Sequence, residues 1–90
     1  MRIIILDGTR FTDREAAHDY LQSALQLPAW YGRNLDALAD CIGEWTADTL
    51  LILQHPDAVE TGLGDYGANL LTVLETVGNQ SGGFRYVKQE

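Results

Sequence analysis

Three short apolar runs, separated by longer polar and amphipathic segments, set the pattern of the chain. The first is a β-branched run over residues 2–6, closed by Asp7 and Gly8, and the second covers residues 49–54. The third, over residues 84–87, alternates apolar and polar side chains. Short runs of this kind, bounded by turn residues, predict β-strands. We therefore expect three strands at these positions.

The segment after the first run has the periodicity of an amphipathic helix. Thr12 and Glu15 have the spacing of a capping box, which predicts the start of a helix over residues 13–26. Pro28 stops the continuation of this helix. Residues 29–33 then form a loop that carries two adjacent aromatic residues.

Further helices are expected before the second and third strands. A second helix covers residues 35–45, and a turn after the second strand leads into a short helix around residues 57–60. A third amphipathic helix is expected over residues 66–77. Gly78 ends it, and a glycine-rich loop over residues 81–83 follows.

The order of elements is therefore strand, helix, helix, strand, short helix, helix, strand. Strands joined through helical crossovers favour a parallel sheet, and right-handed crossovers place the helices over it. Ninety residues are enough for one domain. We expect a single α/β domain over residues 1–90, with a three-stranded parallel sheet packed by three main helices and one short helix. Because three strands make a narrow sheet, one of its faces can stay open.

The middle of the chain is an acidic block. The formal net charge is −7, and residues 34–84 contain no lysine or arginine. The acidic side chains in this stretch are Asp36, Asp40, Glu44, Asp48, Asp57, Glu60, Asp65 and Glu75. Nucleic-acid affinity comes from Lys and Arg on phosphates, so this distribution argues against a nucleic-acid partner and favours a cationic protein. Solubility alone is the other explanation, because net charges of this size are common in small domains.

The expected helix over residues 35–45 has two opposite faces. Asn34 is a favourable N-cap, and Asp36 lies in the first turn, where the helix dipole favours an anion. At about 100° per residue, an apolar stripe lies opposite an acidic face; the stripe is Leu35, Leu38, Ile42 and Trp45, and the acidic face is Asp36, Asp40 and Glu44. Like charges four residues apart repel by roughly 0.2–0.5 kcal/mol per pair. Stability alone therefore gives no reason to align these carboxylates.

The acidic face also follows the aromatic loop, which holds Trp30 and Tyr31. The neighbours of Asp40 on this face are small: Ala37, Ala39 and Gly43. Small neighbours let a partner approach the carboxylate closely, and Trp and Tyr are enriched at interface centres. This face is therefore a candidate protein-binding surface. The alternative is a solvated helix face with both rings packed down on the fold.

The residues most often used in catalysis form no recognisable motif. His18, expected on the solvent side of the first helix, and His55, in a turn, share no motif with the single cysteine. That cysteine, Cys41, is expected on the flank of the second helix as a packing residue rather than a nucleophile. Two carboxylates one turn apart are too common to establish an acid–base pair or a divalent-ion site. We therefore expect no enzyme activity, no metal and no cofactor.

The sequence contains no apolar run that is typical of a targeting signal or a membrane span. No apolar run approaches the ~20 residues of a membrane span, and the apolar start at residues 1–6 is too short for a signal peptide. One cysteine excludes an internal disulfide. We expect a cytoplasmic protein with no membrane partner.

Residues 27–45 carry a specific string. It consists of Leu-Pro, two aromatic residues and Gly, then Asn-Leu-Asp-Ala-Leu, one further residue, Asp-Cys, and a Trp four positions later. This string closely resembles the barstar family; elsewhere the agreement lies in length and element order, with Gly67 and Ala68 also similar. Members of that family are intracellular inhibitors of small secreted bacterial ribonucleases, built on a three-stranded parallel sheet with helices. The resemblance implies a barstar-like fold and a protein inhibitor of a small, basic ribonuclease.

The resemblance also implies roles for individual residues. The aromatic pair packs on the enzyme around its active site, while Gly32 and Asn34 shape the binding loop. Asp36 pairs with basic groups at the substrate site, and Asp40 enters the catalytic pocket at a phosphate-binding position. The partner-binding residues, with their flanking positions, are then Trp30, Tyr31, Gly32, Asn34, Asp36, Ala37, Ala39, Asp40 and Glu44.

The chain departs from the family pattern at several of these positions. Ala39 stands where the family commonly has a large aromatic residue, and Glu44 replaces a small one. Arg33 puts a positive charge in the loop. Thr76, with Glu75 beside it, stands where family members can carry an acidic contact in the final helix. These departures leave the identity of the enzyme open.

The expected partner is a secreted or toxin ribonuclease, bound as a one-to-one heterodimer. Two alternatives stay open at this point. One is an immunity protein against an interbacterial toxin ribonuclease. The other is an acidic decoy that mimics nucleic acid against another nucleic-acid-binding protein.

Overall fold

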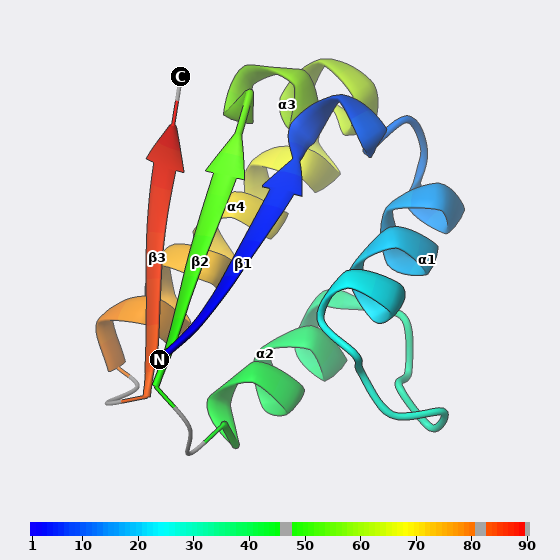
Figure 1. The fold of residues 1–90 in the computed structure, drawn as a ribbon. Helices are drawn as coiled ribbons and strands as arrows, with labels where there is room; N and C mark the ends of the chain where they lie inside the picture. The colour runs from blue at the N-terminus through cyan, green and yellow to red at the C-terminus, as the bar shows by residue number, and fades with distance from the viewer. Residues whose placement is uncertain (46–47, 81–82, 90) are drawn as a thin grey trace.

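Three parallel strands form one sheet in the order β1-β2-β3 (Figure 1). The strands are β1 (Arg2–Asp7), β2 (Thr49–Gln54) and β3 (Phe84–Gln89). The computed structural model describes residues 1–45, 48–80 and 83–89. The predicted α/β class and parallel sheet are confirmed, with β3 two residues longer than expected.

The helices pack against one face of this sheet and leave the other uncovered (Figure 1). They are the short 3-10 turn η1 (Gly8–Arg10), α1 (Arg14–Ala24), α2 (Leu35–Gly43), α3 (Pro56–Leu63) and α4 (Asp65–Gln80). The helix-facing positions of the central strand, Leu51 and Leu53, are fully buried, whereas Ile3 and Ile5 of β1 are more than half exposed. The expected arrangement of three main helices and one short helix is confirmed, and so is the open face.

One continuous core fills the space between the sheet and the helices. Its apolar members come from every strand and from all four α-helices, because each element turns one apolar stripe toward the same interior. The largest fully buried side chains are Phe11, Phe84, Leu6, Leu21, Leu25, Leu38, Ile42, Leu51, Leu53, Leu70, Leu74 and Val59. The core stripe predicted for the second helix therefore holds at its two central positions, Leu38 and Ile42.

The start of α1 differs from the prediction. Asp13, not Thr12, is the N-cap: its backbone is extended, and its carboxylate accepts a hydrogen bond from the Ala16 amide at 2.8 Å. The capping-box assignment was wrong because an Asp one residue further on satisfies the same first-turn amides. The helix also ends at Ala24, two residues before the predicted end.

The predicted bounds of the other helices need similar corrections. α2 ends at Gly43, so Trp45 lies outside it, and α3 is longer than the expected single turn. α4 continues through Gly78 to Gln80 instead of stopping at the glycine. A Cβ at Gly78 would lie 3.3 Å from the Cβ of Tyr86, so this glycine allows α4 and β3 to approach closely. Of the predicted loop over 81–83, positions 81 and 82 lie outside the described residues.

His18 joins α1, α4 and the loop before α2. Its Nδ1 lies 2.6 Å from the Tyr31 hydroxyl, and its Nε2 lies 2.7 Å from the Tyr66 hydroxyl. The side chain is buried, with an exposed fraction of 3%. The prediction of a solvent-facing His18 was therefore wrong. The two tyrosine hydroxyls satisfy both ring nitrogens, so the imidazole is buried without an unpaired polar atom.

The surroundings of His18 favour its neutral form. Burial lowers the pKa of His18 below its ordinary value of 6.5, and the guanidinium groups of Arg33 and Arg14 lower it further. The carboxylate of Asp19 acts in the opposite direction with a smaller effect. A neutral imidazole has one donor and one acceptor nitrogen, so one tyrosine donates to it and the other accepts from it.

Gly67 and Gly43 provide a test of helix packing. A Cβ at Gly67 would lie 2.5 Å from the Val59 carbonyl oxygen, whereas one at Gly43 would meet nothing within 4 Å. Both substitutions to alanine gain the same intrinsic helix preference of about 0.5–1 kcal/mol. Urea denaturation should show that Gly67→Ala lowers the free energy of unfolding by about 1–3 kcal/mol, since α3 and α4 must separate. Gly43→Ala should leave it unchanged or raise it, and equal losses in both variants would contradict this account.

The buried imidazole predicts a pH dependence of stability. Because the native pKa of His18 lies below the unfolded value, the unfolded chain binds more protons between the two, and stability falls as the pH drops below about 6.5. In His18→Gln, the free energy of unfolding should be lower at pH 7.5 and change less between pH 7.5 and pH 5. Asn69→Ala, at an exposed position of α4, removes no titratable group and is the control that should keep the wild-type slope. An unchanged slope in His18→Gln would refute the assignment.

Candidate functional site

The loop between α1 and α2 is fixed to α1 by Arg33. Its Nη2 donates to Asp19 Oδ1 at 2.7 Å and to the Glu15 carbonyl at 3.2 Å, and its Nη1 donates to Gln22 Oε1 at 3.2 Å. The backbone of Arg33 is left-handed, with a φ of 57°. The positive charge that the sequence places in the loop is thus turned toward α1 and balanced there by Asp19.

The two adjacent aromatic residues of the loop point in different directions. Trp30 has an exposed fraction of 73%, whereas Tyr31 has one of 4%. The Tyr31 hydroxyl is held by His18, and its pKa is raised, mainly because burial disfavours the phenolate. Both rings were expected to face a partner, but in this structure only the Trp30 ring is available. The sequence could not separate them, because the distinguishing partner, His18, is thirteen positions away.

The first turn of α2 is built by the loop. Asn34 is the N-cap, and its Oδ1 accepts a hydrogen bond from the Ala37 amide at 2.8 Å, as predicted. The Asn34 Nδ2 donates to the Gly32 carbonyl at 3.3 Å. A Cβ at Gly32 would lie 3.3 Å from the Ala37 Cβ, so a larger residue would press the loop away from the helix. These contacts fix the direction in which α2 leaves the loop.

α2 separates its apolar and acidic faces as the sequence predicts. Leu38 and Ile42 are fully buried, and the side chains of Asp36, Asp40 and Glu44 are all exposed. Among the described residues, no Lys or Arg forms an ion pair with these three carboxylates. Three aligned carboxylates are therefore exposed to solvent, and no ion pair among the described residues neutralises them.

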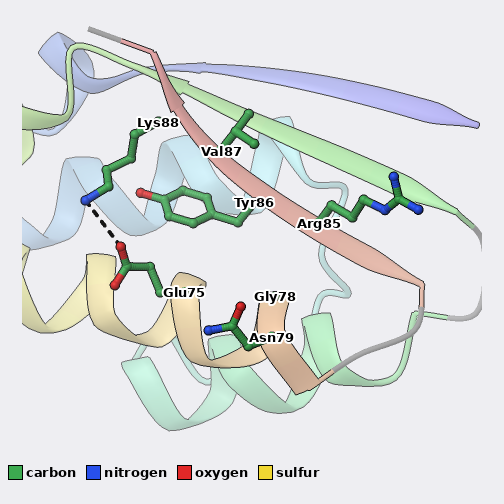
Figure 2. A pocket seen from close by; sticks show the side chains of 7 residues that line it. All are labelled: Glu75, Gly78, Asn79, Arg85, Tyr86, Val87 and Lys88. Carbon is green, nitrogen blue, oxygen red and sulfur yellow. Dashed lines mark ion pairs between the residues drawn. The ribbon is translucent and has the colours of Figure 1, made fainter.

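Asp40 stands beside a shallow hollow between α2 and α4. The hollow is lined by Ala39, Asp40, Gly43, Val77 and Gln80. Gln80 and Val77 were missed at the sequence level, since no local signal shows that the end of α4 passes beside α2. The acidic residue considered on α4, Glu75, faces β3 instead and pairs with Lys88 at 3.2 Å (Figure 2). Thr76 is exposed on α4.

The single thiol of the chain is not arranged as a nucleophile. Cys41 is buried, and burial, followed by the nearby Glu44 and Asp40 carboxylates, raises the pKa of its thiol. A raised pKa keeps the sulfur protonated, which is the reverse of an activated nucleophile. Cys41 is thus the packing residue that was predicted. Within the described part of the chain, no group of three or more His, Cys, Asp or Glu side chains could hold a metal ion.

A separate hollow lies between α4 and β3. Figure 2 shows Tyr86 and Lys88 directed toward α4 across this hollow, where the Glu75–Lys88 ion pair spans the two elements. Burial, followed by the Glu75 charge, raises the pKa of Tyr86 to about 12. None of the residues lining this hollow belongs to the loop or to α2, so it is distinct from the candidate surface.

No helix within residues 1–45, 48–80 or 83–89 is long and apolar enough to cross a membrane.

Comparison with known proteins agrees with this geometry. The family model described as Barstar (barnase inhibitor) matches residues 1–89. The chain is also 43% identical, over 76 residues, to a protein of Bacillus subtilis (strain 168) named "Putative ribonuclease inhibitor YrdF"; the match covers 83% of this chain and 84% of that protein. With its parallel three-stranded sheet, its helical layer and this match over nearly its whole length, the chain belongs to the barstar family.

Proposed function

We propose that this protein inhibits a small basic ribonuclease by covering its active site with the loop around Trp30 and the acidic face of α2. The family and the name of the Bacillus subtilis relative support ribonuclease inhibition in general terms. One observation carries the more specific proposal. It is the exposed carboxylate of Asp40, which has small neighbours and no internal cation among the described residues.

The chemistry of the target explains why a carboxylate is suitable. A ribonuclease binds its anionic phosphodiester with Arg, Lys and His side chains. The Asp40 carboxylate accepts several such charge-assisted hydrogen bonds and offers no bond to cleave. Ala37 and Ala39 are both half-buried, and their small side chains leave room beside the Asp40 carboxylate for the rim of an enzyme cleft. Asp36, one turn earlier, pairs with a flanking base, and Glu44 adds charge at the far end.

The loop supplies the apolar part of the proposed interface. Trp30 is the exposed ring, and large aromatic side chains supply much of the binding energy at interface centres. Tyr31 contributes indirectly, because its hydrogen bond to His18 holds the loop in place. Gly32 and Asn34 set the path of the backbone between Trp30 and α2.

The acidic block supports fast encounter with a basic enzyme. Residues 34–84 carry no Lys or Arg, so the surface around α2 attracts a cationic partner from a distance. Barnase and barstar are themselves a reference system for such steering, so this part of the proposal follows the family. We propose a one-to-one complex with a secreted or toxin ribonuclease, formed in the cytoplasm of the cell that the inhibitor protects.

Asp40→Ala tests the central role of the carboxylate. Titration of barnase with this variant, followed by RNA cleavage, should show weaker inhibition by about 2–5 kcal/mol, because truncation leaves buried enzyme cations unpaired. Asp57→Ala removes a charge that is also exposed, on α3, and should stay within about 0.5 kcal/mol of wild type. Both variants should remain folded by circular dichroism. Equal losses in both would refute the assignment, and wild-type protein that leaves barnase fully active would count against the proposed target class.

Salt dependence tests the acidic block. The association rate with barnase, measured by stopped-flow fluorescence, should fall steeply as ionic strength rises, because screening acts over about 10 Å at 0.1 M. The dissociation rate should change much less. An association rate independent of salt would remove the acidic block from the mechanism. Binding only to a DNA-handling protein would favour the decoy alternative.

A further inference from the structure

The uncovered face of the sheet is apolar at its centre. Alternation along the strands places Ile3 and Ile5 of β1, Leu50 and Ile52 of β2, and Val87 of β3 on this side. Ile3, Ile5 and Val87 have exposed fractions of 56%, 55% and 45%, while the two central-strand residues are half-buried. Figure 2 shows Arg85 and Val87 on the opposite side of β3 from Tyr86 and Lys88, which face α4. We call this surface the open sheet face.

The register of the strands arranges this face in three rows. Ile5, Ile52 and Val87 lie side by side across the middle. The row toward the strand starts is Ile3, Leu50 and Arg85, and the row toward the strand ends is Asp7, Gln54 and Gln89. The Gln54 Nε2 donates to the Gln89 Oε1 at 3.0 Å, so this last row is polar and mutually paired. The face therefore has an apolar centre and one polar end.

Arg85 is unusual among the basic residues of the chain. Arg2, Arg10 and Arg14 lie over the rings of Trp45, Tyr20 and Tyr66, at 4.6, 4.7 and 4.1 Å from the ring centroids. Arg33 and Lys88 form ion pairs with Asp19 and Glu75. Within the described part of the chain, Arg85 has neither an ion pair nor a ring contact. Its charge is available to a partner.

A negative charge occupies the diagonally opposite corner of the same face. Arg85 lies on the edge strand β3 in the first row, and Asp7 lies on the other edge strand, β1, in the last row. Hydrogen bonds from the hydroxyl and the amide of Thr9 lower the pKa of Asp7 and keep it ionised. Consider a two-fold axis that lies in the plane of the interface, passes near Ile52 and is perpendicular to the line joining the two corners. This axis places Arg85 of one copy against Asp7 of the other. The face is therefore complementary in charge to a second copy of itself.

We propose that two copies of this chain associate through their open sheet faces, with Arg85 of each copy against Asp7 of the other. Ile52 then lies near the two-fold axis, and the central row of each sheet packs on the other. Exchange of the two corners requires the strands of the two sheets to cross at nearly a right angle, which is one of the two common ways in which sheets stack.

The size of the face sets the strength of this association. Three strands about 5 Å apart and six residues of about 3.3 Å give a footprint of roughly 15 by 20 Å. That is well below the ~800 Å² per partner of a stable complex. The dimer is therefore weak and depends on concentration. The face lies on the opposite side of the sheet from the helical layer that contains α2, so association leaves both Trp30 loops free (Figure 1).

Sedimentation velocity on the full chain, from about 10 μM to about 1 mM, tests the proposal. The weight-average mass of the wild type should rise toward that of a dimer, and Ile5→Lys should stay monomeric throughout. Thr72→Lys, which adds the same charge on the exposed face of α4, should dimerise like wild type. Circular dichroism confirms that each variant is folded. A wild type that stays monomeric, or an Ile5→Lys that dimerises normally, would overturn the proposal.

A charge reversal tests the orientation of the two copies. Arg85→Glu sets like charges against each other at both corners and should weaken dimerisation by about tenfold. Adding Asp7→Asn, which keeps an oxygen for the Thr9 amide, should recover part of that loss. Unchanged dimerisation in Arg85→Glu would overturn the proposed arrangement. Inhibition of barnase by Ile5→Lys should equal that of the wild type, so the dimer and the proposed inhibitory function can fail independently.

Discussion

A buried imidazole between two phenols joins three separate parts of this protein: α1, the loop before α2 and the start of α4. His18 lies on α1, Tyr31 lies in the loop, and Tyr66 lies at the start of α4. Each of the three would be costly to bury alone, because an unpaired polar group loses its hydration without compensation. Together they satisfy one another, and the loop takes its path from that mutual pairing. Trp30, the neighbour of Tyr31, remains exposed on the same loop.

α2 then carries this fixed loop geometry onto the acidic surface. Its N-cap, Asn34, bonds both the first turn of the helix and the loop, while Leu38 and Ile42 seat the helix in the core. A helix held at one end by its cap and along one side by buried residues has no freedom to rotate about its axis. The outward direction of Asp40 is therefore set by apolar side chains on the opposite face.

Much of this could be predicted from the sequence, and the failures have a common physical cause. Local signals gave the three strands, the Asn34 cap and the two faces of α2, since each depends on residues within a few positions. The side of the chain on which His18 or Tyr31 lies depends on contacts thirteen and forty-eight positions away. Gly78 looked like a helix end, yet its role is to admit β3, which is visible only once both elements are placed.

α2 has a buried apolar side and an exposed acidic side, and this division affects which of its positions can change during evolution. Asp36, Asp40 and Glu44 are exposed, and a Cβ at Gly43 would meet open space. Substitutions at the outer positions can thus accumulate without disturbing Leu38 or Ile42. Such a helix allows the charges on its outer side to change while the core that holds it stays the same.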